Sequence, residues 1–196
     1  MNYYIDFDNT LYNTPLLLQK MMKTIYDCID NMEESDKDKL YNSKTIDDIN
    51  HIINDFSKKY GVNNNNIIHE VHNVILNGSS MVFPDSIPFI EKLQKNNNLF
   101  LLSYANNNLK YQTAKILGSN LLQYFDGTYI TCKPKYDLDI DYSNGIFIDD
   151  NPRDLEGLYS KNPIKLIRLR RKENKYSSID LSFKIEEYTK FDEIKI

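Results

Sequence analysis

This sequence of 196 residues has few cysteines and no long apolar run, and its acidic residues outnumber its basic ones. The two cysteines, Cys28 and Cys132, stand far apart without repeated spacing, so neither a disulfide framework nor a cysteine-rich zinc site is expected. The longest apolar stretch, residues 99–102, is far too short to cross a bilayer. The N-terminus lacks a basic segment followed by an apolar run, so we predict no secretion signal, no membrane partner and a cytoplasmic location.

Basic residues are outnumbered, with 24 lysines and arginines against 28 aspartates and glutamates and a formal net charge of −4. Nucleic-acid-binding proteins usually carry the opposite balance, so no nucleic-acid partner is expected. One short basic cluster, Arg168, Arg170, Arg171 and Lys172, is interpreted as a solvated strand end. Nothing in the sequence indicates the oligomeric state.

What the chain does have is an ordinary globular composition, with 41% hydrophobic and 27% charged residues. Its length suits one well-packed domain with a modest insertion. Short apolar runs bounded by polar residues are typical of strands buried on both faces of a parallel sheet. They lie at residues 3–5, 99–102, 128–131, 145–148 and 164–167.

Helical periodicity separates these predicted strands, at residues 86–95, 109–117 and 153–160. Strands that alternate with helices indicate an α/β fold with a doubly wound parallel sheet of the Rossmann-like kind. We therefore expect a core formed by residues 1–11 and 84–196.

The long connection at residues 12–83 is the exception to this alternation. A structureless loop of that length is not expected in a compact domain. Apolar residues recur there at helical spacing in three segments, which include Leu17 and Met21, then Ile49 and Ile53, then Val71. We predict a small α-helical domain inserted directly after the first strand.

Polar side chains gather where the predicted strands end. Asp6 and Asp8 follow the first strand, Ser103 the second and a lysine-proline pair the third, while acidic residues follow the fourth. Ligands of open α/β sheets bind beyond the carboxyl ends of the strands. Converging carboxylates repel one another unless a cation lies between them, and oxygen-only ligands suit Mg²⁺. The set therefore predicts magnesium-assisted phosphoryl transfer.

In these segments the chain resembles the haloacid dehalogenase-like (HAD) phosphatase superfamily. Residues 6–11, with the sequence Asp-Phe-Asp-Asn-Thr-Leu, resemble its first motif, and Ser103 resembles its second. Lys133-Pro134 resembles the third motif and residues 149–154 the fourth, in the family's order across nearly the whole chain. The predicted helical insertion lies where the family places a cap of its first type.

The resemblance implies a role for each matching position. Asp6 would be the nucleophile, and Asp8 the general acid and then the general base. Magnesium would bind to Asp6, Asp150 and the backbone carbonyl of Asp8. The phosphoryl oxygens would be held by Ser103 and Lys133, with Asn106 near the pocket, and the supporting residues would be Thr10, Asp149 and Asp154.

Two of these assignments have competitors within the sequence. Lys135 competes with Lys133 for the phosphate-binding position, and Lys110 and Lys115 are more distant candidates. The following Pro134 matches the family pattern and favours Lys133. Asp149 competes with Asp150 as the direct metal ligand, and Asp150 is preferred.

The sequence leaves three possible functions open. The first is a phosphatase that hydrolyses a small soluble phosphorylated metabolite. Asp8 favours a phosphatase or a phosphomutase, because the dehalogenases and transport ATPases of the family lack an aspartate there and expulsion of an alkoxide needs an acid. The second is a sugar phosphomutase, and the third is a non-catalytic regulatory or binding module on the same fold.

Overall fold

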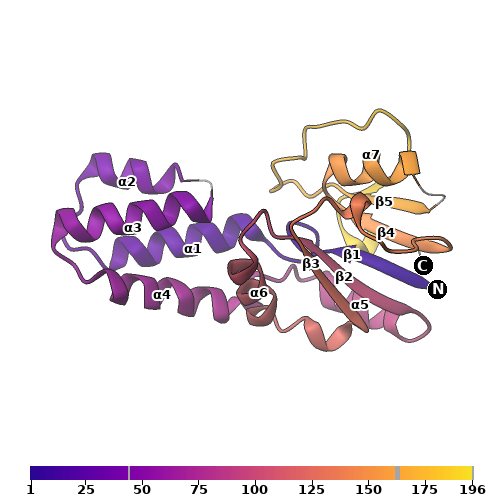
Figure 1. Ribbon diagram of the computed structural model, residues 1–196, viewed down its shortest axis with the longest axis horizontal. Helices are drawn as coiled ribbons and strands as arrows, with labels where there is room; N and C mark the ends of the chain where they lie inside the picture. Colours follow the sequence, from indigo (N-terminus) through magenta and orange to yellow (C-terminus); the bar gives the residue numbers. More distant parts are fainter. Residues whose placement is uncertain (44, 162–163, 196) are drawn as a thin grey trace.

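The computed structural model describes residues 1–43, 45–161 and 164–195. Within them, six parallel strands form one sheet in the order β3-β2-β1-β4-β5-β6 (Figure 1). The strands are β1 (Asn2–Asp6), β2 (Asn98–Tyr104), β3 (Gly127–Thr131), β4 (Gly145–Asp149), β5 (Lys165–Leu169) and β6 (Glu186–Tyr188). The first five match the predicted runs, and β6 is an additional edge strand. The prediction of a doubly wound parallel sheet is confirmed.

Helices cover both faces of this sheet because side chains alternate along each strand. On one face, Tyr3 and Ile5 pack in the same cluster as Ile90 of α5 (Ser86–Gln94). On the other face, Tyr4 packs in the same cluster as Leu155 of α7 (Pro152–Lys161). The remaining core helix, α6 (Leu109–Gly118), lies on the α5 side. Short 3₁₀ turns occur at Gly78–Met81, Leu122–Tyr124, Lys135–Asp137 and Phe191–Glu193.

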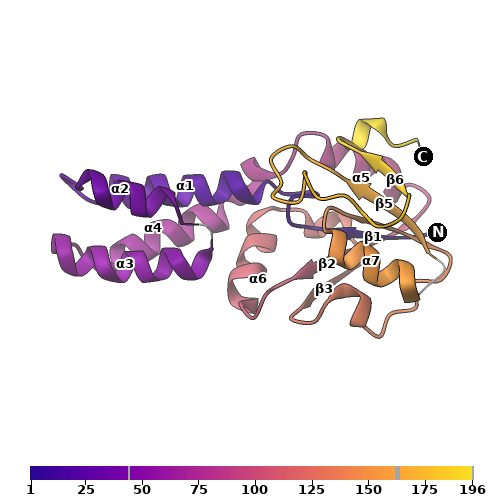
Figure 2. The ribbon, with the colours of Figure 1, turned by 90° about the horizontal axis from the view of Figure 1, so that it is seen from above.

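The segment between β1 and α5 forms a separate helical unit, made of α1 (Thr14–Asp27), α2 (Glu34–Tyr41), α3 (Ile46–Tyr60) and α4 (Asn64–Leu76). Three of these helices match the predicted segments, whereas α2, which buries only Leu40, was not predicted. Figures 1 and 2 show the unit projecting from one end of the core. Its apolar helix faces meet one another, with Leu17, Ile53 and Val71 all buried.

Two chain segments that run side by side join the helical unit to the core. Tyr12, in the segment that leaves the core, pairs with Val82, in the segment that returns to it. The backbone N–H of Asn13 donates to Met81 O at 2.8 Å, and that of Phe83 donates to Leu11 O at 2.9 Å. These bonds tie the entrance and the exit of the unit together directly after β1. The division at residues 12–83 stays a prediction, and residue 196 lies outside the described residues.

Helix α6 provides a second contact between the core and the helical unit. A Cβ atom built on Gly118 would lie 2.1 Å from the carbonyl oxygen of Ile75 in α4, so only glycine permits this approach.

In the part of the chain that the structure describes, none of the helices combines the length and the apolar character needed to cross a membrane.

Candidate active site

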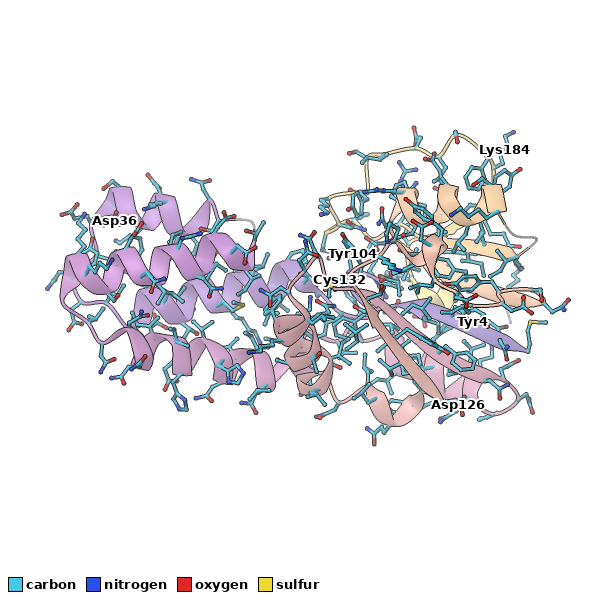
Figure 3. All side chains as sticks on the ribbon, viewed as in Figure 1. Tyr4, Asp36, Tyr104, Asp126, Cys132 and Lys184 are labelled. Atoms are coloured by element: carbon cyan, nitrogen blue, oxygen red, sulfur yellow. The ribbon has the colours of Figure 1, made fainter. Side chains whose placement is uncertain are left out.

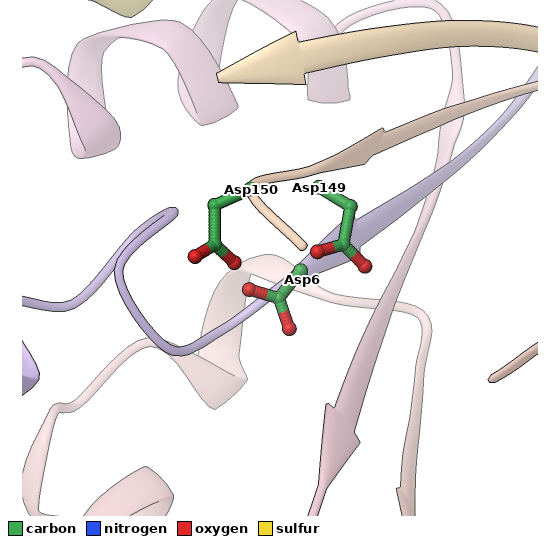
Figure 4. A group of neighbouring side chains, drawn as sticks. All are labelled: Asp6, Asp149 and Asp150. Atoms are coloured by element: carbon green, nitrogen blue, oxygen red, sulfur yellow. The ribbon is translucent and has the colours of Figure 1, made fainter. Parts of the chain in front are cut away.

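Three carboxylates meet at the carboxyl ends of the two central strands. Asp6 ends β1 and Asp149 ends β4, with Asp150 next to it. Each offers one oxygen to a group whose members all lie within 4.8 Å of one another. Figure 4 shows the three side chains turned toward a common point. All three are buried, so their charges are poorly screened by water.

Lys135 is the cation of this cluster. Its side chain is buried, and its Nζ donates to Asp6 Oδ1 and, at 2.7 Å, to Asp149 Oδ2. Asp154 Oδ2 lies 3.9 Å from the same Nζ. The backbone N–H of Lys135 also donates to Asp154 Oδ1 at 3.1 Å, which fixes the turn that carries the lysine. One ammonium group therefore faces several carboxylates.

The electrostatics of the cluster show an excess of negative charge. Burial raises the pKa of Asp149 to about 8, although Lys135 opposes the shift. Burial and the neighbouring carboxylates Asp6 and Asp149 raise the pKa of Asp150 well above its ordinary value. Burial also raises the pKa of Asp6, and its Oδ2 is buried with no hydrogen-bond partner among the described residues. This cluster can accept a cation.

Asp8 lies two residues beyond Asp6 and has a different environment. Its Oδ1 accepts hydrogen bonds from the side chains of Thr14 and Lys115, and its Oδ2 accepts one from Gln112 Nε2 at 2.5 Å. Burial by itself would raise the pKa of Asp8, but the Lys115 ammonium and these hydrogen bonds hold it below its usual range. Asp8 is therefore an ionised carboxylate here.

Gln112 connects Asp8 to Ser103. The same Nε2 atom donates to Ser103 Oγ at 2.5 Å, and both residues are buried. Because Gln112 is the donor, the Ser103 hydroxyl still has its proton available to donate.

Thr10, also fully buried, accepts a hydrogen bond at its backbone carbonyl from Arg171 Nε at 3.0 Å, which ties the loop after β1 to the segment after β5.

A cleft of about 400 Å³ opens above these groups. Asp6, Asp8, Asp150, Lys115 and Lys135 line it from the core. Its outer wall includes the exposed side chains of Tyr104, Asn106, Arg153 and Lys175. Figure 3 shows Tyr104 and Cys132 where the sheet approaches the helical unit, whereas Asp36 lies at the far end of that unit. The cleft therefore lies at the junction of the core and the helical unit.

The structure separates the two competing lysines after β3. The Lys133 side chain is exposed and does not line the cleft, and its backbone N–H and carbonyl both bond to Thr131 Oγ1. The physical reason is that the chain turns after Pro134 into the short helix Lys135–Asp137, which points the second lysine inward. The geometry therefore corrects the preference for Lys133 and places its alternative, Lys135, at the carboxylates.

The other sequence-predicted residues come together around the cleft. Asp6, Asp8, Asp150 and Asp154 line it, Asp149 and Ser103 lie buried beside it, and Asn106 is at its rim. Asn106 has a positive φ of 41°, and its Oδ1 lies 3.5 Å from the Tyr104 hydroxyl. Asp149 and Asp150, the two candidates for the direct metal ligand, both belong to the acidic group.

Sequence reasoning missed several residues that contact these groups. Asn174, buried in the loop after β5, donates from Nδ2 to Asp150 Oδ2. Thr14 and Gln112, which bond to Asp8, were not singled out either. The sequence did hold one signal for this contact. Gln112 and Lys115 are three residues apart in a predicted helix, so both side chains lie on the same helix face.

The comparison with solved structures agrees with this architecture. No family model and no curated protein sequence matches the chain. Among solved structures it resembles YfnB, a candidate HAD-hydrolase from Bacillus subtilis solved with bound magnesium, at 12% identity and a TM-score of 0.66, covering 98% of this chain and 95% of that one.

Two further similar structures carry different activities in their names. A 2-haloacid dehalogenase from Pseudomonas syringae pv. Tomato is 14% identical, with a TM-score of 0.56 over 97% of this chain and 94% of that one. A candidate β-phosphoglucomutase from Thermotoga maritima is also 14% identical, with a TM-score of 0.53 over 85% and 84% of the two chains. The resemblance predicted from the motifs is confirmed at the level of the fold.

Proposed function

We propose that this chain, which has the fold of the HAD-like hydrolases, is a magnesium-dependent phosphatase of small phosphomonoesters. The observation that carries the proposal is the buried acidic cluster of Asp6, Asp149 and Asp150 around Lys135, with Asp8 held close by. A nucleophile, a cation site and a proton-transfer group are the parts that phosphoryl transfer through a covalent intermediate requires.

A magnesium ion fits the residues that are present. The candidate ligands are all oxygens, which hard divalent cations prefer. The unpartnered Oδ2 of Asp6 and the raised pKa values of Asp149 and Asp150 indicate negative charge without enough counter-charge. Asp6, Asp150 and the Asp8 carbonyl would hold the ion, and YfnB was solved with magnesium. When bound, magnesium would neutralise charge on the transferring phosphoryl oxygens.

In the first step, a carboxylate oxygen of Asp6 attacks phosphorus and the bond to the leaving oxygen breaks. Asp8 gives its proton to that oxygen, so the leaving group departs as a neutral alcohol. Because the pKa of Asp8 is lowered in this structure, Asp8 must take up a proton before this step, and loss of its contact with Lys115 would raise that pKa and favour the uptake. Through this contact Lys115 controls how readily Asp8 holds the proton that the acid step needs.

In the second step, Asp8, now a carboxylate, takes a proton from a water molecule whose oxygen attacks the aspartyl phosphate. The bond from phosphorus to Asp6 breaks, which restores the carboxylate and releases inorganic phosphate. The Lys135 ammonium and the Ser103 hydroxyl are the donors that we assign to the phosphoryl oxygens, with Asn106 at the rim. The lowered pKa of Asp8 keeps it in the carboxylate form that this step requires.

Dehalogenation is the less suitable chemistry for this site. A halide departs without protonation, so that reaction would need no acid at the position where Thr14, Gln112 and Lys115 hold Asp8. An alkoxide needs an acid, which Asp8 can supply.

The test is phosphate release from a panel of phosphomonoesters by the full chain, with magnesium and with chelator. We expect magnesium-dependent release by the wild type and none by Asp6→Asn, which keeps the size of the side chain but removes the nucleophilic charge. Folded, magnesium-loaded protein that is silent on every monoester would overturn the proposal. Isomerisation of a hexose phosphate without net phosphate release would instead favour the phosphomutase. A lack of activity in both assays would favour the non-catalytic module.

A further inference from the structure

A second cavity adjoins the catalytic cleft and lies against the helical unit. Its volume is about 590 Å³. The cleft and the cavity share three lining residues, Asn9, Thr14 and Lys175, so the two spaces meet beside Asp8. Sites for small organic ligands typically have volumes of about 300–1,000 Å³, so the cavity can hold the organic part of a substrate whose phosphoryl group lies in the cleft.

One wall of this cavity is apolar. Pro15, Leu18 and Met22 of α1 line it at spacings of three and four residues, which places them on one helix face. Tyr41, the last residue of α2, continues this wall with a side chain that is 50% exposed. A half-exposed tyrosine ring beside an apolar helix face offers a surface on which a flat ring can stack.

Polar lining residues come from the loop after β5. It contributes Glu173, Asn174 and Lys175. Asn174 is already bonded to Asp150, and the Lys175 ammonium lies 4.8 Å from the centre of the Tyr176 ring. Figure 2 shows this loop reaching toward the start of α1. The loop therefore forms part of the cavity wall, while one of its residues contacts the acidic cluster.

We propose that this cavity binds the leaving group of the substrate and selects phosphomonoesters whose alcohol carries an aromatic ring on a short linker. The inference rests on the proposed phosphatase function and adds the substrate class. An aromatic ring would gain contact with Leu18, Met22 and the Tyr41 ring. A bare sugar could bond to the polar residues of the loop after β5, but the hydroxyls that face the apolar side chains would lack partners there, which is unfavourable.

The sharpest test compares 2-phenylethyl phosphate with ethyl phosphate, because the two substrates differ in the ring alone and have similar leaving oxygens. We expect kcat/KM to be at least about tenfold higher for the aromatic ester, since that factor corresponds to about 1.4 kcal/mol of burial. Glucose 6-phosphate should be poorer than the aromatic ester. Tyr41→Ala and Leu18→Asn should each lower the ratio of the two kcat/KM values several-fold.

A matched control is Ile68→Asn, which also changes an exposed apolar residue of the helical unit but lines a different cavity. It should leave the ratio at the wild-type value. A wild-type ratio near one, or a preference for glucose 6-phosphate, would overturn the inference while leaving the phosphatase intact.

Binding of non-hydrolysable analogues tests the cavity independently of catalysis. Calorimetry with magnesium present should show 2-phenylethylphosphonate binding about tenfold more tightly than ethylphosphonate, and Tyr41→Ala should remove most of that difference. Equal affinities would overturn the inference. Tight binding of the aromatic phosphonate without turnover of any ester would support the proposed role of the cavity and contradict the proposed phosphatase activity.

Discussion

Replacing Lys135 by methionine should be the most damaging single change at the site. The substitution keeps an unbranched side chain of similar length but removes the ammonium group that bonds to Asp6 and Asp149. The residues around it are almost completely buried, so water cannot replace the lost charge. Removing one partner of a buried ion pair typically destabilises a protein by about 3–5 kcal/mol.

For a chain of 196 residues, that loss corresponds to a fall of roughly 6–20 °C in Tm. The measurement is thermal and urea unfolding in chelator, where no divalent cation can substitute for the lysine. The effect should be smaller at pH 5 than at pH 8, because protonation of the raised-pKa carboxylates relieves their repulsion. Magnesium should restore part of the stability, but phosphate release should stay lost.

Lys133→Met is the matched control, since the same change is made two residues earlier at an exposed position. It should alter the free energy of unfolding by less than about 0.5 kcal/mol and leave activity unchanged. The reasoning would be refuted if Lys135→Met were as stable as the wild type in chelator, or if the two variants lost the same stability.

Three further predictions concern the metal, the proton donor and the junction with the helical unit. In chelator, wild-type stability should fall as the pH rises from about 4 toward 8, because burial raises the pKa of Asp149 from 3.8 to about 8 and the folded state holds a proton that the unfolded state releases. Asp150→Asn should weaken that dependence and abolish the rise in Tm on adding magnesium. Lys115→Met should raise the pKa of Asp8 and so move the alkaline limb of kcat/KM to higher pH. Gly118→Ala should destabilise the protein by about 1–3 kcal/mol in urea, because its Cβ would meet a backbone carbonyl of α4 at 2.1 Å.

Controls and contrary outcomes separate these effects. Lys110→Met, an exposed lysine on the same helix as Lys115, should leave the pH profile of kcat/KM unchanged. An identical shift in both variants would show that general surface charge, and not the contact with Asp8, sets the profile. A chelated protein whose stability rises between pH 4 and 8 would contradict the raised pKa values, and an unperturbed Gly118→Ala would contradict the close approach of α6 to α4.

The sheet and the acidic cluster were predictable because both depend on local patterns. Buried parallel strands leave apolar runs in the sequence, and their carboxyl ends meet at one edge of the sheet. Asp6, Asp149 and Asp150 directly follow such runs, so their convergence needs no knowledge of loop conformation. Strand β6 was missed because its sequence, Glu-Glu-Tyr, lies at the sheet edge and is largely exposed.

Residues positioned by turns and loops could not be assigned in the same way. Both Lys133 and Lys135 follow β3, and only the direction of the turn after Pro134 decides which one is buried. Asn174 reaches Asp150 from a loop whose path no periodicity indicates. Helix α2 escaped prediction because it buries a single apolar residue and therefore has almost no amphipathic signal.

The most direct test of the central claim is to trap the covalent intermediate. Asp8→Ala retains the Asp6 nucleophile but lacks the base that activates water, so a reactive phosphoryl donor such as acetyl phosphate, with magnesium, should leave the protein phosphorylated. Acid quenching followed by peptide mapping should place the phosphoryl group on Asp6, and the double variant with Asp6→Asn should carry none. Phosphate release by a protein that is never labelled at Asp6, or full activity of Asp6→Asn, would contradict the account.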